Sequence, residues 1–193
     1  MKRLRPIRLF GLLLFLLVLA QPSRGFEASD IVPGTGTIEY AFSPGDDAAG
    51  LIVRAIDGAH LQILVQAFSF THLEIARALI RAKRRGLDVQ VIADLEQIEL
   101  IDHNVIPQLV EAGLPVFTDA EHAAAHNKVM VIDAGANAPV LITGSFNFTH
   151  AAQFRNAENL LVFRGNHELT RAYLDNWMRH LKHSIRFCRG NGK

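Results

Sequence analysis

HNKVMVID (residues 126–133) and VLITGSFN (residues 140–147) are the two short runs that decide the fold of this chain. Each run contains a block of large apolar residues, several of them β-branched, and each carries polar residues at its outer end. The residues between the runs, AGANAP, have the composition of a turn. The pattern predicts two adjacent β-strands, over residues 128–132 and 140–143, joined as a hairpin.

The polar residues of the two runs are expected to meet at the open end of this hairpin. Side chains alternate across a strand, so His126 and Lys128 share one face, as do Ser145 and Asn147. Asp133 lies an odd number of residues from Lys128 and is therefore expected to point to the opposite face.

A register follows if Asp133 lies opposite Pro139 at the turn. Lys128 then lies opposite Gly144, and the histidine two residues earlier lies opposite Phe146. In this register the two polar pairs converge at the same end of the hairpin.

The rest of the chain alternates between strand and helix patterns. The expected strands cover residues 37–42, 61–70, 89–93, 115–117, 128–132, 140–143 and 159–163. The expected helices lie around residues 51–56, from Thr71 (with Glu74 completing a capping box) to Gly86, and over residues 105–112 and 167–183. This order predicts an α/β fold, a layered mixed β-sheet flanked by helices.

The first 20 residues have the pattern of a secretory signal peptide. Four basic residues precede the apolar run 9–20, and Val18 and Ala20 occupy the small-residue positions before a cleavage site. Export to the periplasm or secretion is therefore expected. The alternative is an uncleaved segment that anchors the protein to a membrane, although the run is short for a span. Residues 21–36, rich in Pro, Ser, Gly and Asp, are expected to be a linker, and residues 37–193 a single domain.

Charge and cysteine content limit the classes of function. Removing residues 1–20 takes away four basic and no acidic residues, so the formal net charge changes from +1 to −3. Overall charge therefore gives no argument for nucleic-acid binding. Cys188 is the single cysteine, which excludes an internal disulfide. Local basic clusters remain, and each by itself is typical of a solvated helix face: Arg77, Arg81, Lys83, Arg84 and Arg85, and then Arg179, Lys182, Arg186, Arg189 and Lys193.

The converging polar residues suit phosphate chemistry. A histidine such as His126 can act as a nucleophile or as a general acid or base near neutral pH. Lys128, Ser145 and Asn147 supply donors for phosphate oxygens, and the lysine adds positive charge. Glu158 can accept a hydrogen bond from an imidazole and fix its tautomer. Nothing near these residues has the pattern of a dedicated metal site.

His126-x-Lys128-x4-Asp133 followed by Gly144-Ser145-x-Asn147 resembles the signature of the phospholipase D superfamily. Residues 66–71, 83–89 and 156–159 extend the similarity to its short, single-motif bacterial endonuclease branch, over roughly residues 37–183. The resemblance implies a phospholipase D-like catalytic domain that uses no cofactor and hydrolyses phosphodiesters, in the first place DNA and also RNA.

The resemblance also implies roles for the matching residues. His126 would attack phosphorus and form a phosphohistidine, and Glu158 would orient a histidine. Lys128, Asn147 and Ser145 would bind the phosphate oxygens. Asp133 and Gly144 would be structural.

The implied mechanism needs two histidines, one to attack and one to protonate the leaving oxygen. The chain contains one complete motif. His180-Leu181-Lys182 repeats only its beginning, because Phe187 stands at the aspartate position. The second histidine is therefore expected from a second copy of the chain, in a homodimer whose two-fold axis passes through the site.

Three alternatives to a nuclease stay open. One is a phospholipid phosphodiesterase such as a cardiolipin hydrolase, for which Phe146, Phe148 and Phe154 would form a lipid-facing rim unless they pack in the core. Another is a binding module that has lost its chemistry. The third is a zinc enzyme that uses a histidine set: His103, His122, His126 and His150.

Overall fold

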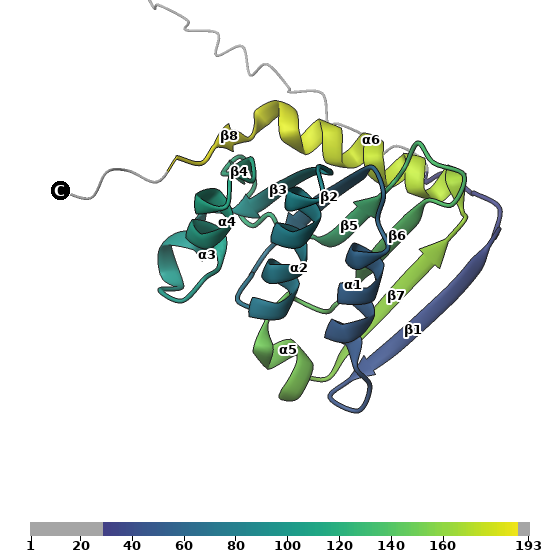
Figure 1. The fold of residues 1–193 in the computed structure, drawn as a ribbon, viewed down its shortest axis with the longest axis horizontal. Coiled ribbons are helices and arrows are strands. Elements are labelled where there is room, and N and C mark those ends of the chain that lie inside the picture. Colours follow the sequence, from purple (N-terminus) through teal and green to yellow (C-terminus); the bar gives the residue numbers. More distant parts are fainter. Residues whose placement is uncertain (1–28, 189–193) are drawn as a thin grey trace, which may run out of the picture. The chain divides into compact units, whose positions relative to one another are not determined.

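An eight-stranded mixed sheet forms the centre of the protein in the computed structural model, which describes residues 29–188 (Figure 1). The predicted signal peptide and residues 21–28 of the predicted linker lie outside the described residues, as do Arg189 and Lys193. The unit that contains the sheet begins at Val32. The strands are β1 (Thr37–Ser43), β2 (Gln62–Ala67), β3 (Asp88–Asp94), β4 (Val116–Asp119), β5 (Lys128–Ile132), β6 (Val140–Gly144), β7 (Glu158–Arg164) and β8 (Ile185–Arg186). The helices are α1 (Ala48–Asp57), α2 (Leu73–Arg84), α3 (Leu95–Leu100), α4 (Ile106–Glu111), α5 (His150–Phe154) and α6 (His167–His183).

The order of strands across the sheet is β1-β7-β6-β5-β2-β3-β4-β8. Strands β2, β3 and β4 run parallel to one another, and all other neighbouring pairs are antiparallel. The expected mixed sheet with flanking helices is confirmed.

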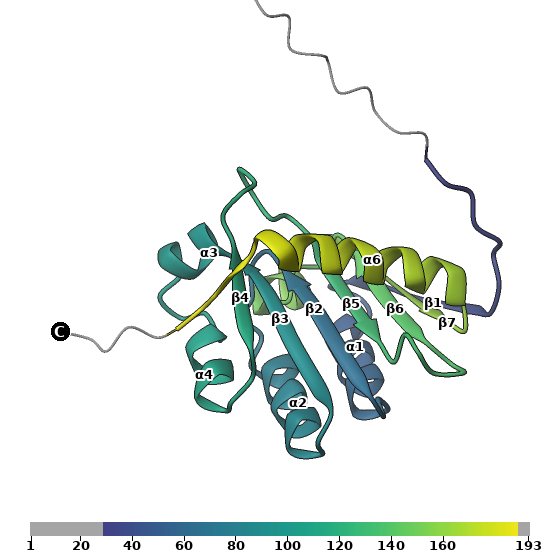
Figure 2. The ribbon, with the colours of Figure 1, turned by 90° about the horizontal axis from the view of Figure 1, so that it is seen from above.

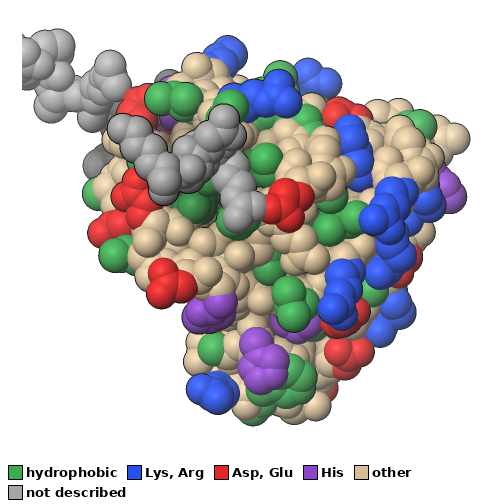
Figure 3. All heavy atoms as spheres, turned by 60° about the vertical axis from the view of Figure 1, so that its left-hand side comes forward, with side chains coloured by type: hydrophobic (Ala, Val, Ile, Leu, Met, Phe, Trp, Pro, Cys, Tyr) green, Lys and Arg blue, Asp and Glu red, His purple; other side chains and the backbone are tan. Residues whose placement is uncertain are grey.

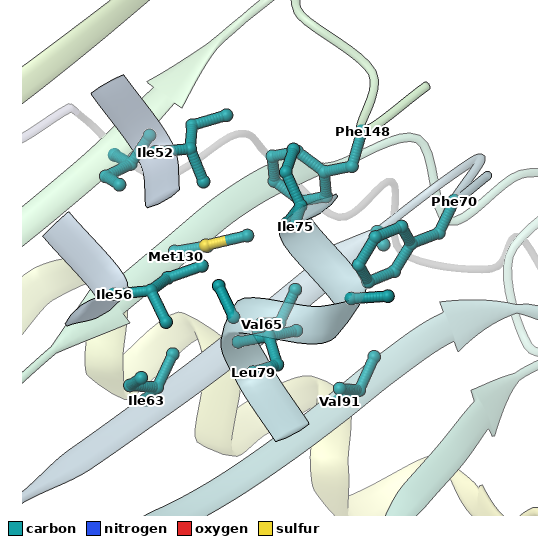
Figure 4. Close-up of a cluster of buried hydrophobic side chains, with 14 of the residues drawn as sticks. Ile52, Ile56, Ile63, Val65, Phe70, Ile75, Leu79, Val91, Met130 and Phe148 are labelled. Carbon is teal, nitrogen blue, oxygen red and sulfur yellow. The ribbon is translucent and has the colours of Figure 1, made fainter. Parts of the chain in front are cut away.

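Helices cover both faces of the sheet (Figure 2). Helices α1, α2 and α4 pack on one face, where side chains such as Ile52, Leu79 and Met130 form the larger core (Figure 4). Helix α6 crosses the other face, where its Trp177 packs against residues of the central strands and donates a hydrogen bond of 3.0 Å to the carbonyl of Val65. Because both faces are covered, the central strands are apolar throughout, as the sequence indicates.

The hairpin of β5 and β6 has the predicted register. Met130 pairs with Ile142 and Ile132 pairs with Val140, which places Asp133 opposite Pro139 in the continuing pairing. The end of β5 that begins at Lys128 therefore lies beside the end of β6 that finishes at Gly144.

Local details differ from the sequence-based expectations at several places. Helix α2 begins at Leu73 with His72 as its N-cap residue and without a side-chain cap, so the predicted capping box of Thr71 and Glu74 is wrong. The backbone N–H of Thr71 donates instead to the carbonyl of Phe148, a tertiary contact that local pattern does not encode. Helices α3 and α5 and strand β8 were not predicted, because each is six residues or shorter and carries little periodicity.

Among the described residues, no helix has both the length and the apolar character that crossing a bilayer requires.

Candidate active site

His126 and Lys128 lie where the loop after β4 enters β5, and they contact each other directly. Lys128 is the first residue of β5 and is buried, whereas His126 is exposed. The Lys128 Nζ lies 2.9 Å from His126 Nδ1 and 2.8 Å from the carbonyl oxygen of the same residue. The imidazole Nδ1 thus faces the lysine, which leaves Nε2 as the ring nitrogen that can approach a substrate.

The aromatic ring of Phe68, the residue after β2, packs against both His126 and Lys128. Its ring centroid lies 4.3 Å from that of His126, and Lys128 Nζ lies 4.8 Å from the same ring centroid. The backbone N–H of Phe68 donates to the carbonyl of Asn127 at 2.9 Å, which fixes the histidine loop against β2. Sequence reasoning did not single out Phe68, since an aromatic residue at a strand end is usually a packing residue.

Burial changes the acidity of Lys128. Desolvation lowers its pKa from the usual 10.5 to about 8, and the negative charge of Glu158 opposes this shift. The lysine is therefore an ammonium at neutral pH, close to the histidine, and loses its proton at a lower pH than a surface lysine.

Ser145 and Asn147 follow the end of β6, and Glu158 is the first residue of the neighbouring strand β7. Ser145 Oγ donates a hydrogen bond of 2.6 Å to Glu158 Oε2 and accepts bonds from the backbone and side-chain N–H groups of Asn159. The side-chain oxygen of Asn147 is buried and has no hydrogen-bond partner within residues 29–188. Its polar amide is thus not committed to an internal contact.

Glu158 differs from its expected position relative to the histidine. Its carboxylate binds Ser145 Oγ and Asn156 Nδ2, and the hydrogen bonds described for His126 do not include it. The physical reason is strand order, because β6 separates β7 from β5. Within one chain, Glu158 acts on the site through Ser145 and through the charge it presents to Lys128.

Asp133 lies directly after β5, at the end of the strand away from Lys128. Its carboxylate accepts three backbone hydrogen bonds of 2.8 Å, from His60, Leu61 and Gln62 at the start of β2. The residue is buried and has a positive φ of 51°. Asp133 thus anchors the far end of β5 to β2 and takes no part in the polar cluster around His126.

Gly144 is needed where β6 ends, directly before Ser145. Its φ is 147°, and a Cβ atom at this position would collide with the carbonyl oxygen of Asn159. That carbonyl accepts hydrogen bonds from the N–H groups of Ser145 and Phe146, so the collision would disturb the turn that presents Ser145.

Gly144→Ala is expected to lower the free energy of unfolding by about 2 kcal/mol or more, because the backbone must shift to admit the methyl group. Gly135→Ala is the matched control, since a Cβ at Gly135 meets nothing within 4 Å. Chemical denaturation of both variants measures the difference, and equal stabilities would contradict the steric argument.

The other candidate residues from the sequence separate into different places. Phe146 and Phe148 are fully buried and belong to the core, so they do not form a lipid-facing rim; Phe154 is 58% exposed. The histidine set proposed for zinc is not assembled in the described part of the chain. His122 instead lies with Asp119, His180 and His183, in the one group of possible metal ligands found within residues 29–188.

Comparison with known proteins agrees with this geometry. Residues 52–181 match the family described as "Cardiolipin synthase, PLD-like domain". The chain belongs to the phospholipase D family.

Relatives within the phospholipase D family include both sequences and solved structures. A phospholipase D of Rickettsia felis is 36% identical over 141 residues, which are 73% of this chain and 68% of that protein. The mitochondrial cardiolipin hydrolase of Homo sapiens is 30% identical over 135 residues, which are 70% of this chain and 51% of that protein. The crystal structure of Nuc from Salmonella typhimurium, a phospholipase D family member, superimposes with a TM-score of 0.74 at 30% identity and covers 80% of this chain and 100% of that one. The protein is thus a phosphodiesterase of the phospholipase D type.

Proposed function

We propose that this chain is a metal-independent, nonspecific endonuclease that cleaves DNA, and also RNA, through a phosphohistidine on His126, at a site shared by two copies of the chain. The observation that carries the proposal is the exposed imidazole of His126, with Nδ1 held 2.9 Å from the ammonium of the buried Lys128. A nucleophile beside a fixed positive charge suits attack on an anionic phosphodiester. Its setting, proposed from the N-terminal sequence, is outside the cytoplasm.

The ammonium of Lys128 decides which ring nitrogen of His126 is free. While it donates to Nδ1, the neutral imidazole carries its proton on Nε2 and cannot attack. An arriving phosphate attracts the ammonium, which then binds the phosphate oxygens together with the Asn147 amide. Ser145 joins them when its hydroxyl turns from Glu158 Oε2 to the phosphate. The imidazole can then lose its Nε2 proton to water and take up a proton on Nδ1, so that Nε2 presents a lone pair to phosphorus.

The reaction proceeds in two displacements. In the first, a bond forms between His126 Nε2 and phosphorus while the bond from phosphorus to the leaving oxygen breaks, and the second histidine donates a proton to that oxygen. In the second, the same histidine removes a proton from water, the water oxygen attacks phosphorus, and the bond from Nε2 to phosphorus breaks. The products are a phosphomonoester and a free hydroxyl group.

The second histidine is proposed to be His126 of another copy. His180, from the partial repeat of the motif, hydrogen-bonds to Asp119 Oδ2 at 2.8 Å and belongs to a different cluster. An isologous dimer places identical residues across its axis, so it supplies both histidines to one composite site.

Mixing experiments test the shared site. After subunit exchange between equal amounts of wild-type protein and the His126→Ala variant, activity is expected to fall to about a quarter of that of wild type at the same total concentration, because only a quarter of random dimers hold two histidines. Chains that act singly would retain about half. His103→Ala, a variant at an exposed histidine outside the site, is the mixing control and should cause no loss.

The pKa of Lys128 predicts the alkaline limit of activity. The ammonium binds phosphate, and its pKa is about 8, so kcat/KM is expected to be full below this pH and to fall as the pH rises through it. A pH profile between about 6.5 and 10 measures the limit. The Lys128→Arg variant keeps its charge throughout this range, so its residual activity should lack the falling limb. A wild-type profile that stays flat up to pH 10 would contradict the role of the ammonium.

The openness of the site supports a polymeric substrate. His126 and Ser145 are exposed, so an extended phosphodiester backbone can reach the nucleophile from solvent. The basic cluster of α2 contributes less than its sequence indicates. Figure 3 shows Lys and Arg side chains in a band on the surface with acidic residues among them, and Arg81 and Arg77 form ion pairs with Asp57 and Glu74. The last turn of α2, residues 81–84, also lies roughly 12–17 Å along the helix from Leu73, the end near the site.

A phospholipid is the second candidate substrate, and a pocket beside the site favours it. Leu73 and Phe154, both exposed, line a cavity of about 320 Å³ together with Thr71, His72, Glu74 and His150. The N–H groups of Thr71 and His72 donate to the carbonyl of Phe148, one residue after Asn147, so the pocket adjoins the phosphate-binding turn. An apolar pocket at this place suits an acyl chain. The curated relatives named as phospholipases and cardiolipin hydrolases agree with this reading.

The deciding experiment offers both substrates to the purified protein in excess EDTA. Circular DNA is expected to be nicked and linearised, and cardiolipin vesicles to release little phosphatidic acid. The reverse result would establish the phospholipid as the substrate and overturn the nuclease proposal. A requirement for added metal that persists in the His122→Ala variant, which lacks one residue of the Asp119 group of possible metal ligands, would overturn the metal-independent mechanism.

A further inference from the structure

Three histidines surround one buried carboxylate at the edge of the sheet, and none of them belongs to the active site. The carboxylate is Asp119, the last residue of β4, whose side chain has no exposed area. His180 Nδ1, His183 Nε2 and His122 Nδ1 lie 2.8, 3.1 and 3.2 Å from Asp119 Oδ2. His180 and His183 come from the last turn of α6, and His122 comes from the loop between β4 and β5.

The spacing of these four groups fits a tetrahedral cation. One ligand atom from each residue can be chosen so that all four lie within 4.8 Å of one another. Four ligands around zinc, each 2.0–2.1 Å from the ion, are separated by about 3.3 Å, so small side-chain movements would close the set. Three imidazole nitrogens and one carboxylate oxygen are also ligands that zinc accepts.

Glu121 supplies the outer support that a metal-bound histidine usually has. Its Oε2 lies 3.4 Å from His183 Nδ1, on the ring nitrogen opposite the one that faces Asp119. A carboxylate at this position accepts the Nδ1–H bond and leaves Nε2 unprotonated for a metal. His122 is 47% exposed on its side chain, so the cluster has an opening through which an ion can enter.

We infer that Asp119, His122, His180 and His183 form a structural zinc site that fastens the loop carrying His126 to the last turn of α6. The loop spans residues 120–127. Its other described anchors include the hydrogen bond of 2.8 Å from the Ala125 N–H to Asp94 Oδ2 and the bond of 2.9 Å from the Phe68 N–H to the carbonyl of Asn127. Zinc in this place replaces the hydrogen-bonding protons between the imidazoles and Asp119 by four coordinate bonds. The ion takes no part in the reaction, so the inference does not depend on the proposed activity.

Metal content tests the inference directly. The full chain is purified without a polyhistidine tag, loaded with zinc, separated from free metal and measured by elemental mass spectrometry. About one zinc per chain is expected in the wild type and less than about 0.1 in the His122→Ala/His180→Ala/His183→Ala variant. His103→Ala and His150→Ala, at exposed histidines outside the cluster, should keep the full content. Loading with Co²⁺ should produce the visible absorption bands of a tetrahedral site in the wild type only.

A variant with one substitution tests the same site in case the triple variant does not fold. His122→Ala removes the most exposed of the three histidines and should leave the chain folded. It should weaken zinc binding by more than about 100-fold, the upper end of the loss that removal of an outer partner causes. Zinc should also raise the Tm of the wild type and leave that of the triple variant unchanged. A wild type that retains no zinc after loading, or variants that retain as much as the wild type, would show that the cluster is a hydrogen-bonded histidine–carboxylate network and would overturn the inference.

Discussion

Replacing His126 with alanine is expected to reduce phosphodiester cleavage by about 10⁴-fold or more, because the variant lacks both the attacking atom and its symmetric partner across the proposed dimer. The side chain is exposed and its loss removes one hydrogen bond from Lys128, so the free energy of unfolding should change by about 1 kcal/mol or less. Steady-state rates on circular DNA and on cardiolipin vesicles, measured beside urea unfolding, separate the loss of chemistry from the loss of structure.

His103→Ala is the matched control for this prediction, since His103 is also exposed and lies outside the site. It should keep full activity. A residual rate within tenfold of wild type for His126→Ala would show that another group attacks phosphorus, and the mechanism would then have to be abandoned.

Replacing Asp133 with alanine is expected to cost about 3–5 kcal/mol of stability, because three backbone N–H groups lose a charged acceptor at once. Those groups belong to His60, Leu61 and Gln62, so the damage falls on the pairing of β5 with β2 in the centre of the sheet. Urea unfolding can be followed by the fluorescence of Trp177, the single tryptophan of the chain. Trp177 packs on the face of the sheet that α6 covers.

Two further variants test whether the lost hydrogen bonds of the Asp133 carboxylate cause this loss of stability. Asp133→Asn keeps one acceptor oxygen and tolerates the positive φ of 51°, so its loss should be smaller, about 1–3 kcal/mol. Asp102→Ala, at an exposed turn, should change stability by less than about 0.5 kcal/mol. If Asp133→Ala were as stable as Asp102→Ala, the three hydrogen bonds would contribute no net free energy to folding. That result would contradict the structural role of Asp133.

Several features of the fold followed from the sequence because they depend on neighbours in the chain. The register of β5 with β6 was predictable, since a six-residue turn and the alternation of side chains leave few ways to pair the two runs. Helix α6 was predicted with its observed bounds, residues 167–183, because its apolar residues recur at helical spacing. The separation of Asp133 from Lys128 followed from their places at opposite ends of one predicted strand.

Other features depended on contacts that no local pattern encodes. Within one chain the order of strands places Glu158 against Ser145, and its predicted contact with a histidine of the second copy stays a prediction. The lowered pKa of Lys128 results from burial of its side chain in the folded protein. The position of a lysine at the start of a predicted strand does not indicate whether its side chain is buried.

The sequence by itself determined the family signature, the hairpin that presents it and the alternation of strands and helices, because these rest on short-range periodicity. Only the tertiary structure decided which distant side chains meet. Asp119 and His122 lie about sixty residues from His180 and His183, and they come together because α6 crosses the sheet and ends at β4. Pairing at that distance along the chain is set by the packing of a whole helix on a whole sheet, which the spacing of a few residues cannot specify.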